Sequence, residues 1–250
     1  RRKTLGSNHK DTISSLADLG VVYFGQGKSN EAEECFREAL KAQQKLYGKD
    51  HPATMNTMLN LGNALFTQKK YEEAKPLLIE VLETNRRIHD NDDPKVVTVL
   101  NSIGALLKVQ GKFAESEPYY QEALEISTRV SGDSHPKTLW LRGSLGDLFA
   151  AQGKLEEAEA IYAKSLETSR KAYGDENRST VFLMGGVGEL LLKQEKYAEA
   201  EIALLELIEI YKRTLPSEHT DNYWAYETLA KIYEGWGKPE KAKKYRALLP

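Results

Sequence analysis

The sequence has one cysteine, no long apolar run and almost no net charge. Cys35 allows no internal disulfide and suits a reducing compartment. No stretch of about 18 consecutive apolar residues occurs, so we expect no membrane-spanning segment. The net charge of −2 provides no basic field that would attract nucleic acid or an anionic membrane. We therefore expect a cytoplasmic protein that binds neither nucleic acid nor membrane.

What the sequence does contain is a repeat of 42 residues without insertions. One lysine column recurs at this period: Lys28, Lys70, Lys112, Lys154, Lys196 and Lys238. A column of small residues precedes it: Gly20, Gly62, Gly104, Gly146, Gly188 and Ala230. A fixed period of about 20–50 residues is typical of a solenoid, in which each unit packs only on its neighbours.

Each repeat has the pattern of a helical hairpin. Leu16, Leu19, Gly20 and Tyr23 share one helix face, and a second helix follows the turn at residues 27 and 28. The sequence predicts an all-α fold of twelve helices in six antiparallel pairs, an α-solenoid with a right-handed superhelix and no strands. The predicted hairpins form a single array over residues 9–250: 9–50, 51–92, 93–134, 135–176, 177–218 and 219–250. Residues 1–8 are interpreted as the tail of a missing upstream repeat.

The helix starts share a residue that can act as an N-cap. This column contains His9, His51, Asp93, His135, Asn177 and His219. Each side chain can accept a hydrogen bond from a free backbone N–H, and proline follows three of them, as it does at the first position of many helices. A histidine metal site is the alternative, but His51 and His135 are two repeats apart, too far to share one ion. We expect neither a metal nor a cofactor.

The pattern Leu16-x-x-Leu19-Gly20-x-x-Tyr23 with Ala32-x-x-x-Phe36 resembles the tetratricopeptide repeat, usually 34 residues long. The eight extra residues are expected to lengthen the second helix by about two turns. The long form, with Tyr47-Gly48-Lys49-Asp50-His51-Pro52, is similar to the repeats of kinesin light chain. The C-terminal segment from Tyr233 to Pro250 is similar to arrays attached to bacterial serine/threonine kinases.

Catalytic motifs are missing from the sequence. There is no Walker motif, no His-Glu-x-x-His, no Cys-x-x-Cys and no kinase signature. Gly185-Gly186-Val187-Gly188 looks like a phosphate loop, but it falls in the middle of a predicted helix. We therefore expect a protein that is not an enzyme.

The resemblance implies that the first helices line a concave groove, and it supplies candidate peptide-binding residues. These are Asn56, Asn60, Asn63, Phe66, Asn101, Lys108, Trp140, Asp147, Phe182, Glu189, Trp224 and Lys231. Asn60, Asn63 and Asn101 resemble the asparagines with which kinesin-light-chain grooves hold a peptide backbone, since an amide both donates and accepts. Trp140, Phe182 and Trp224 are expected to lie over glycines with open space beneath.

Each half of this site has a structural alternative. The amides could cap or bridge neighbouring helices, and the aromatic rings could pack between adjacent repeats. The leading hypothesis is a monomeric, non-enzymatic protein–protein interaction scaffold whose groove takes a peptide or helix that is apolar with basic residues. A regulatory or sensor segment of a larger signalling enzyme, such as a serine/threonine kinase, is the second hypothesis. RNA binding is disfavoured because the sequence has no basic stripe.

Overall fold

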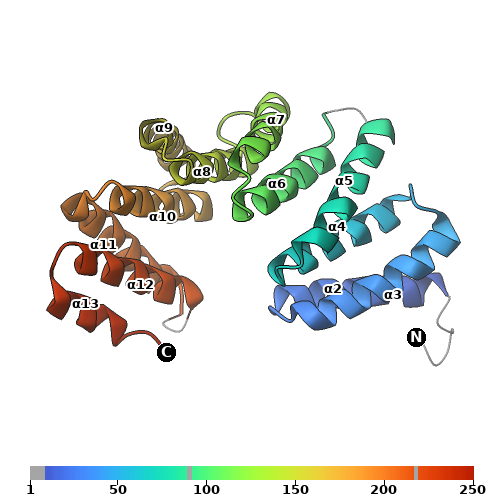
Figure 1. Cartoon of the computed structure of the whole chain (residues 1–250), viewed down its shortest axis with the longest axis horizontal. Coiled ribbons are helices and arrows are strands. Elements are labelled where there is room, and N and C mark those ends of the chain that lie inside the picture. Colours follow the sequence, from blue (N-terminus) through green and yellow to red (C-terminus); the bar gives the residue numbers. More distant parts are fainter. Residues whose placement is uncertain (1–8, 89–91, 217–218) are drawn as a thin grey trace. The chain divides into compact units, whose positions relative to one another are not determined.

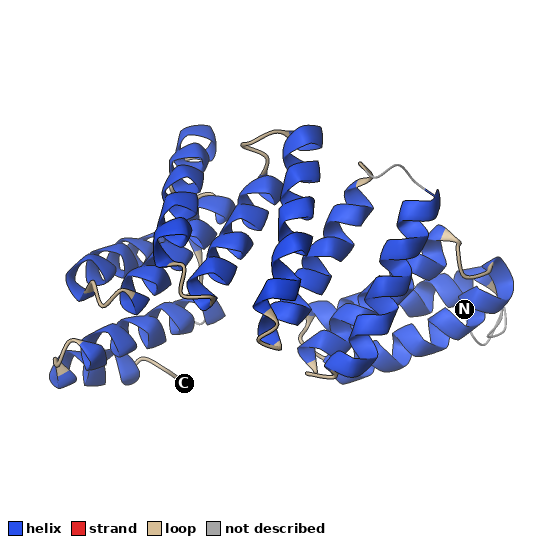
Figure 2. Ribbon diagram, turned by 45° about the horizontal axis from the view of Figure 1, so that its top comes forward, coloured by secondary structure: helices blue, strands red, loops and turns tan. Residues whose placement is uncertain are grey.

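The computed structural model describes residues 9–88, 92–216 and 219–250, and these residues form twelve α-helices and no strand (Figures 1 and 2). The first helices of the hairpins are α2 (Lys10–Gly25), α4 (Pro52–Thr67), α6 (Pro94–Val109), α8 (Pro136–Ala151), α10 (Arg178–Lys193) and α12 (Thr220–Gly235). The second helices are α3 (Ser29–Tyr47), α5 (Tyr71–Ile88), α7 (Phe113–Ser131), α9 (Leu155–Tyr173), α11 (Tyr197–Thr214) and α13 (Pro239–Arg246). The predicted all-α fold is confirmed.

The chain divides into two compact units, residues 1–126 and 127–250. Every first helix has 16 residues, whereas the second helices have 18 or 19, apart from α13 with 8. The predicted lengthening of the second helix is therefore confirmed for five hairpins. The interpretation of residues 1–8 lies outside the described residues, and the right-handed superhelix stays a prediction.

The six turns share one backbone hydrogen bond, which is donated at the position of the lysine column. The backbone N–H of Lys28 donates to the carbonyl of Tyr23, five residues earlier, at 2.9 Å, and the equivalent bond recurs in every hairpin up to Lys238. This bond is typical of the Schellman motif, in which the preceding residue adopts a left-handed conformation. Glycine occupies that position at Gly27, Gly111, Gly153 and Gly237, but Lys69 (φ 62°) and Glu195 (φ 58°) adopt it without being glycine.

The predicted N-caps are confirmed at all six helix starts. The Nδ1 atom of His51 accepts a hydrogen bond from the Ala53 backbone N–H at 3.2 Å, and Asp93 Oδ1 accepts one from Lys95 at 2.7 Å. The other four cap residues, His9, His135, Asn177 and His219, accept the equivalent bond. These side chains satisfy free N–H groups of the first helical turn.

The small-residue column lets the two helices of a hairpin approach each other. A Cβ atom built on Gly104 would lie 3.1 Å from the ring of Tyr120, and one built on Gly188 would lie 2.0 Å from Leu204 Cδ2. Tyr120 and Leu204 are the large buried residues of the facing second helices. The glycines therefore make room for the core side chains of α7 and α11. Glycine inside a helix lowers its stability, so its recurrence at these positions is explained by this packing.

Arg142 departs from the apolar pattern of its column and is nevertheless buried in the second unit. Its guanidinium donates to the backbone carbonyl of Asp133 at 3.3 Å and forms an ion pair with the Asp133 carboxylate. A buried charge is tolerated when it is paired and hydrogen-bonded, and Asp133 provides both interactions.

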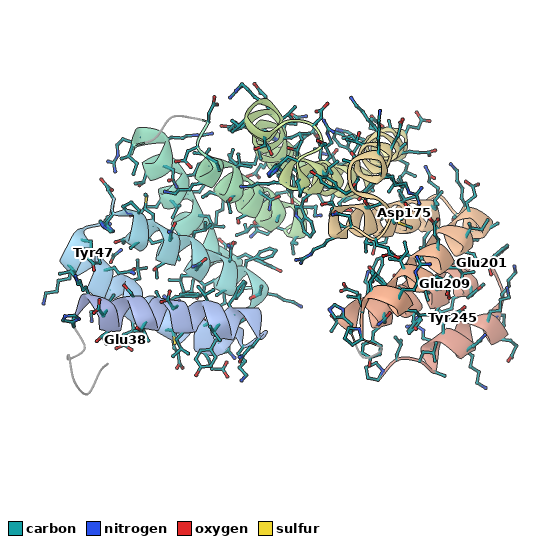
Figure 3. All side chains as sticks on the ribbon, turned by 180° about the vertical axis from the view of Figure 1, so that it is seen from behind. Glu38, Tyr47, Asp175, Glu201, Glu209 and Tyr245 are labelled. Carbon is teal, nitrogen blue, oxygen red and sulfur yellow. The ribbon has the colours of Figure 1, made fainter. Side chains whose placement is uncertain are left out.

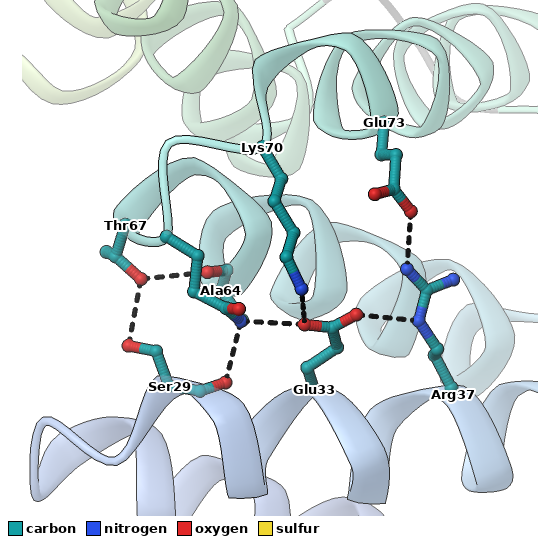
Figure 4. Close-up of polar contacts among 8 residues, drawn as sticks. Ser29, Glu33, Arg37, Ala64, Thr67, Lys70 and Glu73 are labelled. Atoms are coloured by element: carbon teal, nitrogen blue, oxygen red, sulfur yellow. Dashed lines mark hydrogen bonds and ion pairs between the residues drawn. The ribbon is translucent and has the colours of Figure 1, made fainter.

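A polar cluster around Glu33 joins the first two repeats (Figure 4). The Glu33 carboxylate on α3 accepts from Lys70 Nζ at 2.8 Å, Gln68 Nε2 at 2.8 Å and Arg37 Nε at 2.9 Å. Burial alone would raise the pKa of Glu33, but the hydrogen bonds from Lys70, Arg37 and Gln68 together lower it. The lysine of one turn therefore binds the second helix of the preceding repeat.

Glu159 and Glu201 make related contacts in the second unit. Glu159 accepts from Gln194 at 2.7 Å and from Lys196 at 3.3 Å. Glu201 on α11, labelled in Figure 3, accepts from the Tyr233 hydroxyl at 2.5 Å and from Lys241 at 3.0 Å. These contacts tie successive hairpins together on the side of the second helices.

Candidate functional site

The second unit contains a pocket of about 340 Å³ against its three first helices, α8, α10 and α12. Five of the residues predicted from the sequence line it: Trp140, Asp147, Phe182, Glu189 and Trp224. They come from three successive repeats, and the period of 42 residues places them together because equivalent positions of neighbouring first helices lie side by side. The pocket thus combines three aromatic rings with two carboxylates.

The aromatic wall is tightly stacked. The rings of Trp140 and Phe182 are nearly parallel, with centroids 3.9 Å apart and an interplanar angle of 15°. A Cβ built on Gly143 would lie 2.4 Å from the Phe182 ring, and one built on Gly185 would lie 3.0 Å from the Trp224 ring. The expectation of open space is therefore wrong for Phe182 and Trp224, because Gly143 and Gly185 accommodate their rings.

These aromatic rings both pack between repeats and line the pocket. Phe182 and Trp224 are half-buried, while Trp140 is 41% exposed. The packing alternative raised by the sequence thus holds for the inner faces of Phe182 and Trp224, and Trp140 retains the largest exposed ring surface of the three.

The two carboxylates are held by neighbouring hydrogen-bond donors. The Tyr162 hydroxyl donates to Asp147 Oδ1 and, at 3.2 Å, to the carbonyl of Gly143. Glu189 accepts from the side chain of Trp224, yet its pKa is raised by partial burial and by the negative charge of Asp147. Asp147 and Glu189 thus place two acidic groups at one wall, and Lys193 and Lys231 lie near enough to Glu189 to offset part of its charge.

Three further polar residues line the pocket and were not predicted: Arg178, Tyr211 and Asp221. Arg178 and Asp221 lie just after N-caps, and their positions were interpreted only as helix starts. Tyr211 is a second-helix residue, buried and close to Asp221, and both effects raise its pKa to about 12. Its column otherwise holds Gln43, Asn85, Ser127 and Ser169, so the one large aromatic ring was the signal that could have identified it.

A second cavity of about 390 Å³ adjoins the first and shares Arg178, Val181, Tyr211 and Asp221 with it. It adds Glu176 and His219 to the lining. Glu176 forms an ion pair with Arg213 at 3.2 Å. The shared residues lie near the starts of α10 and α12 and on α11.

Lys231 is not among the residues that line either cavity. It is exposed and forms an ion pair with Glu227, one turn earlier on α12, at 2.9 Å. Its ammonium group nevertheless lies near enough to Glu189, a pocket residue, to act on the pKa of that carboxyl in the lowering direction.

The remaining candidates lie on α4 and α6 of the first unit. Asn56 is exposed, and Asn60, Asn63 and Phe66 are half-buried. Within the described residues, none of the three α4 asparagines makes a side-chain hydrogen bond. The ring centroids of Phe66 and Tyr71 are 5.9 Å apart.

Asn101 and Lys108 are half-buried on α6. The Oδ1 atom of Asn101 is covered and has no hydrogen-bond partner.

In the described ranges, no helix is long and apolar enough to cross a bilayer. Residues 9–88, 92–216 and 219–250 also contain no group of three or more His, Cys, Asp or Glu side chains arranged to hold a metal ion.

Solved structures with the same fold include the following three. Nearly identical TPR-like repeats assigned to a kinesin light chain of Podosopora anserina align with a TM-score of 0.70 and 19% identity, over 81% of this chain and 95% of that one. BtubC (BKLC) of P. vanneervenii aligns with a TM-score of 0.64 and 19% identity, over 88% and 89%. Aspartyl phosphate phosphatase F of Bacillus subtilis aligns with a TM-score of 0.69 and 16% identity, over 95% and 58%.

None of the curated proteins compared with the sequence matches it. The family model of the tetratricopeptide repeat matches overlapping segments along nearly the whole length: residues 1–45, 11–87, 55–108, 95–171, 145–213 and 179–245. The six hairpins, their shared turns and this match agree: the chain belongs to the tetratricopeptide repeat family.

Proposed function

We propose that the chain is a non-enzymatic scaffold that binds a peptide segment of a partner protein against the first helices of its second unit. Tetratricopeptide repeats are protein–protein interaction modules, and their fold is generally non-catalytic. The observation that carries the peptide part is the pocket in which Trp140, Phe182 and Trp224 lie beside Asp147 and Glu189. Concave pockets with apolar walls and a few polar groups are typical of ligand sites.

The chemistry of this pocket favours an apolar ligand that carries a positive charge. The exposed face of Trp140 offers both apolar area and a negative ring quadrupole. Asp147 and Glu189 add negative charge at the same wall, whereas Arg178 is the one basic residue that lines it. A lysine or arginine of the peptide beside an apolar anchor fits both properties.

The asparagines of the first unit are proposed to bind a peptide backbone there, separately from the pocket of the second unit. Asn56, Asn60 and Asn63 make no side-chain hydrogen bonds among the described residues, so their amides do not bridge helices there. Asn101 is half-buried, and its amide is proposed to donate to a peptide carbonyl.

Selection from a random peptide library tests this proposal, because it samples the ligand chemistry of the pocket directly. Peptides that bind the whole chain are expected to contain an apolar residue next to Lys or Arg. Binding is then measured by fluorescence anisotropy for the double variant Asp147→Asn with Glu189→Gln. Both changes remove the charge but keep an oxygen that accepts the Tyr162 and Trp224 hydrogen bonds.

The double variant is expected to weaken binding about tenfold or more, the magnitude of losing a partly desolvated charge pair. The matched control is Glu156→Gln with Glu157→Gln, two exposed acidic residues of α9 that do not line the pocket. Equal loss in both double variants, or selected peptides without basic residues, would contradict the proposed ligand chemistry.

A further inference from the structure

A third cavity, of about 250 Å³, is lined by residues of α9, α10 and α11 in the second unit. We call it the Ala203 pocket, and its apolar lining consists of Leu166, Met184, Val187, Ile202 and Ala203. It shares no residue with the pocket that Trp140 lines. On α10, Val187 follows Gly185 of that other pocket by two positions, which is about half a turn of the helix. The two pockets therefore lie on opposite faces of α10.

The small side chain of Ala203 explains this cavity. The equivalent residues of the other hairpins are Cys35, Leu77, Tyr119, Ile161 and Tyr245, and all but the cysteine are much larger than alanine. In the sixth hairpin, the ring centroids of Tyr245 and Tyr226 are 6.2 Å apart, and Tyr226 is the equivalent of Met184. Tyr245 thus occupies in that hairpin the place that Ala203 leaves open in the fifth.

The burial of a neighbouring column changes together with this side chain. Val187 is half-buried, and Leu19, in the hairpin of Cys35, is 42% exposed. In the hairpins with a large side chain in the column of Ala203, the equivalent residues are between 0% and 4% exposed: Leu61, Ile103, Leu145 and Leu229. The Ala203 pocket therefore exposes an apolar residue that a larger side chain covers elsewhere.

The rim of the Ala203 pocket adds a second exposed apolar side chain. Ile202 is 68% exposed, the highest value of any large apolar residue in the described ranges. The equivalent residues are Glu34, Pro76, Pro118, Ala160 and Lys244. An exposed aliphatic side chain beside an open apolar pocket is typical of a surface that binds another protein.

Glu199 gives this surface a negative charge that the chain does not compensate. Its equivalent Glu73 forms an ion pair with Arg37 of the preceding second helix at 2.6 Å. Ala163 occupies the position of that arginine before Glu199. Within the described residues, the Glu199 carboxylate therefore has neither an ion pair nor a hydrogen bond.

Arg170, the basic residue that lines the pocket, is already paired. Its guanidinium forms ion pairs with Glu206 on α11 and with Asp175, both at 2.7 Å. Since Arg170 compensates Glu206, a positive charge of a partner would meet Glu199.

We propose that the Ala203 pocket binds one large apolar side chain of a partner protein that carries a lysine or arginine beside it. The apolar side chain would cover Val187 and contact Ile202, and the basic group would pair with Glu199 as Arg37 pairs with Glu73. This site is independent of the proposed peptide site on the first helices, because the two pockets lie on opposite faces of α10.

A second copy of the chain fits this surface poorly. In a two-fold contact, α11 would face α11, and Glu199 and Glu206 would approach the same acidic residues of the other copy. Helix α11 has basic residues only in its last turn, Lys212 and Arg213. Like charges brought together oppose this contact, whereas a basic partner complements it.

The test fills the pocket from within the chain. Ala203→Ile restores the side chain that Ile161 provides in the fourth hairpin. Ala198→Ile, at an exposed position of α11 outside the pocket, is the matched control. Peptides from a random library are selected on the whole chain, and those that also bind Ala203→Ile are removed. The affinities of the remaining peptides are measured by fluorescence anisotropy.

These peptides are expected to contain Leu, Ile, Phe or Tyr next to Lys or Arg. Ala203→Ile should weaken their binding about tenfold or more, because it occupies the place of the apolar anchor. Its melting temperature should equal or exceed that of the parent, because the new side chain fills open space. Ala198→Ile should leave the affinity unchanged.

Two variants of surface residues test the same site without altering the core. Ile202→Ser should weaken binding several-fold, since this side chain lies on the rim. Glu199→Gln should also weaken binding several-fold, whereas Glu157→Gln, its exposed equivalent on α9, should not.

Four outcomes would overturn the proposal. The first is a selection that yields no peptide able to distinguish the parent from Ala203→Ile, and the second is unchanged affinity in Glu199→Gln. The third is a loss of affinity in Asp147→Asn with Glu189→Gln, which would assign the peptides to the other pocket. The fourth is a dimer of the parent in sedimentation that Ala203→Ile dissociates, since the pocket would then bind a second copy.

Discussion

Lys69 and Glu195 are predicted to destabilise the two turns that lack the glycine of the Schellman motif. Both residues have a left-handed backbone, at φ 62° and 58°. That conformation costs a residue with a side chain about 1–2 kcal/mol of folding free energy. Glycine avoids this cost but loses more conformational entropy on folding, which offsets part of the gain. The net expectation is that Lys69→Gly and Glu195→Gly each increase the free energy of unfolding by about 0.5–1 kcal/mol.

The reverse substitutions measure the same strain. A Cβ built on Gly111 or Gly153 meets no atom within 4 Å, so the change to alanine adds backbone strain and no clash. Gly111→Ala and Gly153→Ala should therefore lower the free energy of unfolding by about 0.5–1 kcal/mol each. Lys69→Ala, which keeps the strain and removes only the side chain, is the control and should be nearly neutral.

Urea and thermal unfolding measure these effects, with a melting shift of about 2–4 °C for each kcal/mol in a chain of this size. Because repeat arrays can unfold in parts, hydrogen exchange at the turn amides should accompany them. A loss of stability in Lys69→Gly, or no loss in Gly111→Ala, would refute the assignment of strain to these turns.

Three further predictions concern stability. Since the folded pKa of Glu33 is lowered, its contribution to stability is present above about pH 4.5 and is lost as the pH falls through the folded pKa. Glu33→Gln should therefore lower the free energy of unfolding by about 1–2 kcal/mol at pH 7 but leave it unchanged in strong acid. Urea titrations at both pH values would check this, with the exposed Glu83→Gln as a control that should show no such difference. Gly104→Leu should cost about 1–3 kcal/mol in thermal unfolding, because its Cβ meets the Tyr120 ring at 3.1 Å; a neutral result would mean that the ring moves freely. Amide exchange should be fastest in the first and last hairpins, and a uniform rate along the chain would contradict the repeat-by-repeat packing.

The fold could be predicted from the sequence because its signals repeat. The N-caps, the turn lysines and the helix-packing glycines each recur in register, so a departure such as Asn177 or Glu195 is recognised against five equivalents. Local chemistry alone decides these features, and the structure confirms them.

The pocket could be predicted only in part. The rings of Phe182 and Trp224 rest on glycines of the preceding repeat, a side-chain arrangement that periodicity does not specify. Tyr211 reaches the pocket from a second helix, and Lys231 is held by Glu227 instead of lining it. The kinase-type resemblance of the C-terminal segment, the cytoplasmic location and the monomeric state stay predictions.

The most direct test of the peptide-binding claim measures affinity and melting together for Trp140→Ala and Trp224→Ala, using a peptide selected on the parent chain. Trp140 is the more exposed ring, so its removal should weaken binding at least tenfold while the melting temperature stays close to the parent value. Trp224 packs on Gly185, so its removal should lower both. Unchanged affinity in Trp140→Ala would contradict the account and leave these rings as inter-repeat packing alone.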